Sequence, residues 1–132
     1  MQDAESEADE ELSSLRLDAE IEPLVAELRA MMWRHAGLLR NEGLLRAGLS
    51  AQGSIAERVA AIVEHAQPSR AVLELQSLLG VARAILLSAL AREESRGAHF
   101  REDFPKRDDS RFCKHSVESA GQVEFEQFDS LN

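Results

Sequence analysis

Residues 69–94 read SRAVLELQSLLGVARAILLSALAREE, and this stretch decides the fold. Leucine, valine and alanine recur along it every three or four residues, which places them on one face of an α-helix. Ser69 can begin that helix by accepting a backbone hydrogen bond at its N-terminus. The predicted buried face consists of Val72, Leu75, Leu79, Ala82, Leu86 and Ala89, and it is widened by Leu78, Ile85, Leu87 and Leu90. The pattern therefore predicts a central helix over 69–94 that is buried on more than one side.

Two further helices are predicted earlier in the chain. The first covers about residues 22–40, and Pro23 suits its first turn. Its apolar face has the helical spacing of Leu24, Leu28, Met31, His35 and Leu38. The second covers about residues 43–66, where Ser54 and Glu57 match a capping box that satisfies free backbone N–H groups. Three apolar helix faces can bury one another, so the predicted fold class is mainly α, a three-helix bundle.

The two ends of the chain do not follow the helical pattern. Six acidic residues crowd the first eleven positions, which predicts a disordered acidic tail over 1–18 and a domain over 19–132. Beyond the third helix, residues 95–132 are predicted to form an ordered, extended polar segment. A small β-hairpin is expected within it, with Gly121 in or near its turn. Its strands are predicted at Phe112, Lys114 and Ser116, and at Val123, Phe125 and Phe128.

The composition predicts a soluble protein from a reducing cellular compartment. The formal net charge of −9 disfavours binding to nucleic acid or to an anionic membrane, because both are polyanions. Cys113 is the single cysteine, so a disulfide within the chain is excluded. The strongly apolar stretch from Ala84 to Ala91 is too short to cross a bilayer, and the first residues do not resemble a secretion signal. We therefore expect a cytoplasmic protein with no membrane or nucleic-acid partner.

The sequence lacks the common motifs that carry chemistry. The seven glycines form neither a G-x-G-x-x-G sequence nor a P-loop, and one cysteine cannot build a zinc or iron–sulfur site. We predict no catalytic, cofactor-binding or metal-binding residue in this chain. His35 is expected in the core or at an interdomain contact, and its neighbour Trp33 is expected to anchor packing. Cys113 is predicted to be an ordinary thiol.

The arginines between positions 92 and 111 admit two interpretations. Arg96 and Arg101 can clamp a carboxylate through paired hydrogen bonds. Alternatively, the arginines at 92, 96, 101 and 107 pair with neighbouring acidic residues, which are Glu93, Glu94, Glu102, Asp103, Asp108 and Asp109. The composition favours pairing within the segment.

Two segments carry a resemblance to a known family. Residues 32–44, MWRHAGLLRNEGL, resemble the first-helix motif of the C-terminal domain shared by succinate dehydrogenase, fumarate reductase and L-aspartate oxidase flavoproteins. Residues 94–109, ESRGAHFREDFPKRDD, resemble that domain's signature after its last long helix. The resemblance covers about residues 20–128. It implies a spectrin-repeat-like three-helix domain that packs on a flavin-binding domain.

The resemblance also implies a function. FAD belongs to the implied full-length enzyme and not to this chain, whose expected partner is the flavin-binding domain. The short link between the second and third helices is more like L-aspartate oxidase, which oxidises aspartate to iminoaspartate in NAD biosynthesis. The candidate interdomain contacts are His35, Arg96, His99 and Arg101. Two alternatives stay open: a succinate dehydrogenase or fumarate reductase domain, and a free-standing helical protein-interaction module.

Overall fold

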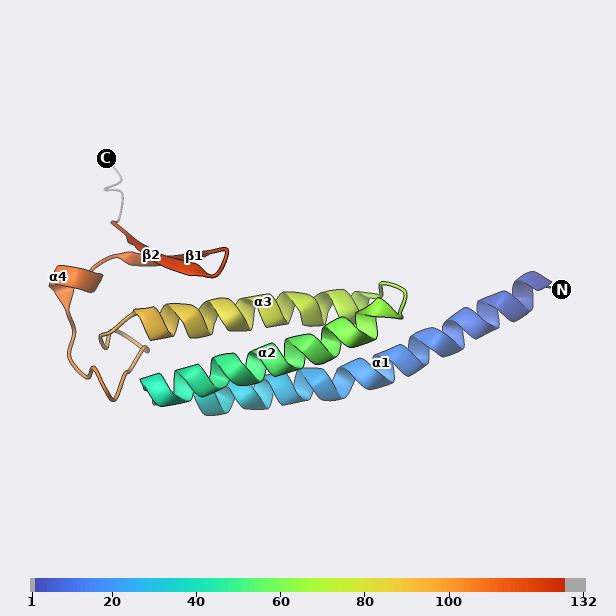
Figure 1. Ribbon diagram of the computed structural model, residues 1–132, viewed down its shortest axis with the longest axis horizontal. Coiled ribbons are helices and arrows are strands. Elements are labelled where there is room, and N and C mark those ends of the chain that lie inside the picture. Colours follow the sequence, from blue (N-terminus) through green and yellow to red (C-terminus); the bar gives the residue numbers. More distant parts are fainter. Residues whose placement is uncertain (1, 128–132) are drawn as a thin grey trace.

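The computed structural model describes residues 2–127, and in this range it contains three long helices, one short helix and a two-stranded antiparallel sheet (Figure 1). The elements are α1 (Gln2–His35), α2 (Glu42–Glu64), α3 (Arg70–Ala91), α4 (Asp109–Phe112), β1 (His115–Ser119) and β2 (Gln122–Glu126). Each long helix contacts the other two, and the hairpin lies beside α3. The predicted class, a mainly α three-helix bundle with a small hairpin, is confirmed.

The core is formed by one face of each long helix. All six residues predicted for the inner face of α3 are buried, as the helical spacing requires. They pack against buried residues of α1 (Ile21, Leu24, Leu28 and Met31) and of α2 (Leu45, Ile55 and Val59). Ser69 caps α3 as predicted, since its Oγ accepts from the backbone N–H of Val72 at 3.2 Å.

The outer face of α3 differs from the prediction. Leu78 and Ile85 are exposed, whereas Leu87 and Leu90 are half-buried, so the predicted widening of the buried face is correct only in part. By length and composition, Arg70–Ala91 is long and apolar enough to cross a membrane, with a mean hydropathy of 1.5. The apolar segment is therefore longer than the stretch from Ala84 to Ala91 on which the sequence prediction was based. The core helix of a soluble protein has the same property, and the buried face of α3 does pack on α1 and α2 as a core helix would.

The beginning of the chain is helical. α1 starts at Gln2, so residues 2–18 are helical in the structure where a disordered tail was predicted, and Pro23 lies inside the helix instead of at its start. Alanine, glutamate and leucine favour helix, and acidic side chains in the first turn interact well with the helix dipole. Residues 2–16 are nevertheless exposed, so this part of α1 extends beyond the bundle, as the blue end of the ribbon shows (Figure 1).

The first two helices meet at a different place from the one predicted. α1 ends at His35, and Asn41 caps α2 by accepting from the Leu44 backbone N–H at 2.9 Å. The capping box at Ser54 and Glu57 is wrong, because α2 continues through both positions. Gly48 lies inside α2 and permits close approach of the helices, since a Cβ there would lie 2.8 Å from a methyl of Leu86 and 2.9 Å from the Cβ of His35.

The C-terminal hairpin is confirmed. β1 and β2 pair in antiparallel register, with Ser116 opposite Phe125, and Ala120 and Gly121 form the turn with positive φ angles of 51° and 81°. Phe112 belongs to α4 and Lys114 lies just before β1, so neither is in a strand as predicted. The remaining predicted strand residue, Phe128, lies outside the described residues.

We expect removal of residues 1–16 to change the thermal midpoint by no more than about 2 °C, because exposed positions contribute little to stability. Leu17 is retained in this variant, since it packs partly against the core. Thermal unfolding followed by circular dichroism checks the prediction. A drop of about 8 °C or more would show that the extension contributes to the fold.

Candidate functional site

Arg101 closes the C-terminal end of α3. Its side chain is 1% exposed, and its Nη1 donates to the carbonyl oxygens of Ala89 and Leu90, each at 2.9 Å. The last carbonyls of a helix have no partners within the helix, so a buried cation there satisfies them and suits the helix dipole. Nε and Nη2 of Arg101 bond both oxygens of Asp103 at 2.8 and 2.7 Å. The hydrogen bonds from Arg101 lower the pKa of Asp103 to about 2.

Glu94 is fully buried and receives four hydrogen bonds. Arg96 donates to both of its oxygens, at 2.9 and 3.1 Å, and Arg92 Nη1 donates to one of them at 2.8 Å. The backbone N–H of Asp108 supplies the fourth bond at 3.0 Å. Burial alone would raise the pKa of Glu94, but these hydrogen bonds outweigh it and the pKa is lowered. A buried carboxylate with both oxygens satisfied is thus held ionised.

Arg92 connects this network to the hairpin. Its guanidinium donates to the carbonyl oxygens of Phe112 at 2.8 Å and Lys114 at 2.7 Å. It also lies over the ring of Phe125, 5.1 Å from the centroid, and that ring packs edge-on against Phe112. The side chain at the end of α3 therefore fixes both α4 and the start of β1.

The pairing interpretation of the arginines is confirmed. Arg96 bonds Glu94 and Asp109, Arg107 bonds Asp109, and Arg101 bonds Asp103. The clamp that the sequence suggested for Arg101 does exist, but it closes on a carboxylate of the same chain. The Arg101 guanidinium is buried and bonded within the chain, so it offers little surface to a partner, and its role as an interdomain contact stays a prediction.

The connection between α1 and α2 is clamped to the segment that follows α3. The Arg40 backbone N–H donates to the Phe100 carbonyl at 3.0 Å, and the Glu102 N–H donates to the Arg40 carbonyl at 2.7 Å. The Glu42 N–H adds a bond to Asp103 at 3.0 Å. The two segments that carry the family resemblance thus lie side by side at one end of the bundle.

His99 lies between these segments and is neutral. Nη1 of Arg40 lies 3.1 Å from its Nδ1, which must accept because arginine can only donate, and its Nε2–H then donates to the Arg92 carbonyl at 3.1 Å. Burial, followed by the charges of Arg40, Arg101 and Arg92, lowers the pKa of His99 below 6.5, against a smaller opposing effect of the bond to the Arg92 carbonyl.

The free energy of unfolding should therefore decrease as the pH falls below 6.5, because unfolded His99 takes up a proton there while folded His99, with its lower pKa, does not. Above that pH neither state is protonated, and the loss is complete below the folded pKa. His99→Gln keeps an acceptor for Arg40 and a donor for Arg92, so it should show a smaller loss. Urea unfolding at about pH 7.5 and about pH 5 measures both proteins. Equal losses would contradict a neutral His99.

His35, the remaining histidine candidate, lies where the three long helices meet. Its Nδ1 is buried and has no hydrogen-bond partner among the described residues. The ring approaches Gly48, which itself lies against Leu86 of α3. The structure places this side chain partly in the core, and its role toward another domain stays a prediction.

Four exposed apolar side chains at the clamped end of the bundle were missed by the sequence reasoning. Trp33 is 74% exposed, Leu38 75%, Leu39 59% and Phe100 39%. We call these four residues the end patch. The expected packing role of Trp33 is wrong within this chain, and Leu38 is not on the buried face. The sequence signal for this patch was Gly37. A Cβ at this position would collide with the Trp33 carbonyl oxygen, so glycine is suited to the turn that ends α1, and Leu38 and Leu39 then follow the helix instead of continuing it.

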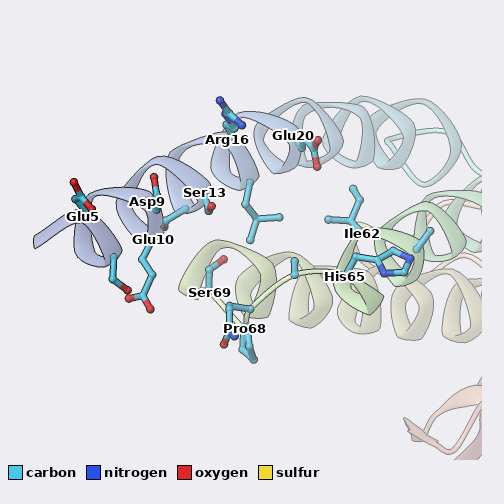
Figure 2. Close-up of a pocket in the computed structure, with 16 residues that line it drawn as sticks. Glu5, Asp9, Glu10, Ser13, Arg16, Glu20, Ile62, His65, Pro68 and Ser69 are labelled. Carbon is cyan, nitrogen blue, oxygen red and sulfur yellow. The ribbon is translucent and has the colours of Figure 1, made fainter. Parts of the chain in front are cut away.

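A second surface feature is an acidic groove of about 1170 Å³ between the extension of α1 and the link from α2 to α3. Figure 2 shows Glu5, Asp9 and Glu10 along one wall, with His65 and Pro68 across from them. Among residues 2–127, no group of three or more histidine, cysteine or acidic side chains is placed to hold a metal ion.

Comparison with known proteins identifies the family. A sequence model described as "Fumarate reductase flavoprotein C-term" matches residues 25–129. The chain belongs to this family. The match contains both segments of the resemblance, which is thereby confirmed, and the exposed extension of this flavoprotein C-terminal domain lies before it.

The relatives of this flavoprotein C-terminal domain are much longer proteins. L-aspartate oxidase 2 of Ralstonia nicotianae is 40% identical over 89 residues, which are 67% of this chain and 16% of that protein. The fumarate reductase flavoprotein subunit of Mycobacterium tuberculosis is 40% identical over 98 residues, 70% of this chain and 17% of that protein. A solved structure of E. coli quinol fumarate reductase FrdA superposes with a TM-score of 0.65 and 26% identity, over 85% of this chain and 22% of that one. The chain spans about a sixth of the curated relatives.

Proposed function

We propose that this chain is the docking domain of an FAD-dependent dicarboxylate oxidoreductase and is inactive without a flavin-binding domain. The observation that carries the proposal is the superposition on 22% of FrdA of quinol fumarate reductase, whose remaining length has no counterpart in the present chain. Removal of hydride requires a flavin held against a fixed substrate, and most of that machinery would lie in the rest of such an enzyme. We also propose a cytoplasmic location.

The residues of this chain do not fit an FAD site. The pyrophosphate of a dinucleotide is held by a glycine-rich turn between a strand and a helix N-terminus. In the described structure, both strands follow all the helices, and the N-termini of α2 and α3 are capped by Asn41 and Ser69. Any FAD of the whole enzyme is therefore proposed to bind elsewhere, and the arginine network serves the fold.

Within the family, we propose L-aspartate oxidase as the parent enzyme, acting in NAD biosynthesis. Two observations support this choice. The link between α2 and α3 is short, comprising residues 65–69, and L-aspartate oxidases of Ralstonia nicotianae and Pyrococcus furiosus are 40% identical over 89 residues and 46% identical over 81 residues of this chain. A fumarate reductase parent is the second candidate, favoured by the longer match to the Mycobacterium tuberculosis subunit.

The test uses this chain together with the Ralstonia nicotianae L-aspartate oxidase 2 truncated before the matching region, whose flavin absorbance verifies that FAD is bound. Alone, the present chain should not change FAD fluorescence or oxidise aspartate or succinate. Calorimetry should detect a complex with the truncated oxidase. Absence of a complex with this flavin-loaded protein would contradict the docking function and favour an independent interaction module.

The choice of parent is tested by the same measurement on the Mycobacterium tuberculosis fumarate reductase flavoprotein, truncated at the corresponding place. An aspartate oxidase parent predicts tighter binding to the truncated oxidase than to the truncated reductase. The opposite order would assign the chain to the fumarate reductases.

A further inference from the structure

We propose that the end patch, and not the arginine cluster, is the surface through which this domain docks onto the flavin-binding domain. This inference rests on the proposed function and adds the location of the contact. Trp33, Leu38, Leu39 and Phe100 are exposed although each is large and apolar. Such side chains gathered at one place usually mark a protein–protein contact.

The four residues come from two segments that the fold brings together. Trp33 lies in the last turn of α1, and Leu38 and Leu39 follow directly after the turn at Gly37. Phe100 joins them because its carbonyl accepts from the backbone N–H of Arg40, the residue after Leu39. In Figure 1 this end of the bundle lies at the left, far from the N-terminus of α1.

The backbone under the end patch is held rigidly. The turn around Gly97 is closed by two backbone bonds between Arg96 and His99, at 2.8 and 3.0 Å. Ser95 Oγ accepts from the Arg101 N–H at 2.9 Å and donates to the Phe104 carbonyl at 2.8 Å. A loop that is already ordered loses little entropy on binding, so these apolar side chains are presented in a preorganised form.

The residue types also suit a docking surface. Tryptophan and phenylalanine are enriched in the centres of interfaces, and arginine is enriched beside them. Arg34 is exposed next to Trp33, and Arg96 keeps about a quarter of its side chain exposed. By contrast, Arg101 is buried and bonded to Asp103 and to helix carbonyls, so it supports the surface from beneath.

The flavin-binding part of the enzyme is the occupant that the comparisons favour. The end patch lies within the family match, residues 25–129, and relatives carry about five times more chain than this match accounts for. Leu12 and Leu15 are also exposed, but they lie before the match. A second copy of the chain is disfavoured because two molecules of net charge −9 repel each other.

The test compares two double variants of the full chain in calorimetric titrations against the truncated, FAD-loaded Ralstonia nicotianae oxidase. Trp33→Ala with Leu38→Ala removes the two most exposed side chains of the end patch. Leu73→Ala with Val81→Ala is the matched control, since both residues are exposed and apolar on the outer face of α3. We expect the first to weaken binding by about thirty-fold or more and the control by no more than about two-fold. Both should unfold at the parent temperature, because the altered side chains are exposed.

The outcomes separate this inference from the proposed function. If the unsubstituted chain and the end-patch variant bind the truncated oxidase equally well, the inference is wrong while the docking function stands. Stronger loss in the α3 control would place the contact on α3 instead. If sedimentation shows a dimer of the parent chain that the end-patch variant abolishes, the patch is a self-association surface and the inference is wrong. A parent chain that does not bind the flavin-loaded oxidase removes both proposals.

Discussion

Arg101→Ala is expected to lower the free energy of unfolding by about 3 kcal/mol. The change removes five hydrogen bonds at once: two to the carbonyls of Ala89 and Leu90, a longer one to the carbonyl of Arg92, and two to the carboxylate of Asp103. The carbonyl of Ala89 is bonded in a buried position and would be left without this donor. Partial exposure of Asp103 moderates the effect, because water can solvate the freed carboxylate.

Arg107→Ala provides the matched control. Arg107 also forms a two-bond contact with an aspartate, Asp109, but both side chains are exposed, so the loss should stay below about 1 kcal/mol. Urea unfolding followed by circular dichroism measures both variants. Similar losses in the two proteins would show that the burial of Arg101 at the end of α3 contributes nothing.

Arg101→Ala is also expected to change how the free energy of unfolding depends on pH. In the folded parent the pKa of Asp103 is about 2, below its ordinary value of 3.8. Its contribution to stability is therefore present above 3.8 and is lost as the pH falls toward about 2. In Arg101→Ala the hydrogen bonds that lower this pKa are absent, so the loss of stability in that range should be smaller than in the parent.

The helices were predictable where burial follows a single period. Along α3, spacings of three and four residues identified all six buried positions, because apolar residues at this spacing share one face of a helix and that face packs against the core. The extension of α1 was missed because charge density was weighed above helix propensity. The pattern of Ser54 and Glu57 did not mark a helix start, because the same local pattern also occurs inside a helix and α2 continues through both positions.

The site was predictable in kind but not in place. Sequence composition indicated that arginines pair with nearby carboxylates, but the partners of Glu94 come from both sides of it in the chain and from the backbone of Asp108. Likewise, the burial of Arg101 depends on how the segment folds back over the end of α3. The end patch depends on the helix stop at Gly37, since one more turn of helix would have carried Leu38 along the predicted apolar face.

Leu86→Ala is expected to lower the free energy of unfolding by about 2–5 kcal/mol, which is the range for removing a large aliphatic side chain from a closed core. Leu86 is fully buried, and one of its methyl groups lies at the place where α3 approaches Gly48 of α2. The helices cannot move closer to fill the resulting cavity, because the backbone of α2 is already near His35 and Leu86 at that glycine. We therefore expect a loss in the upper part of the range.

The neighbouring residue supplies the control for this substitution. Ile85 precedes Leu86 on α3 and is exposed, so Ile85→Ala removes a side chain of the same size without opening a cavity and should cost less than about 1 kcal/mol. Chemical unfolding of both variants in urea, with the slope compared to the parent, gives the two free energies. If Leu86→Ala proved no less stable than Ile85→Ala, the inner and outer faces of α3 would be wrongly assigned. The arrangement in which all three helices pack around Leu86 would then also be wrong.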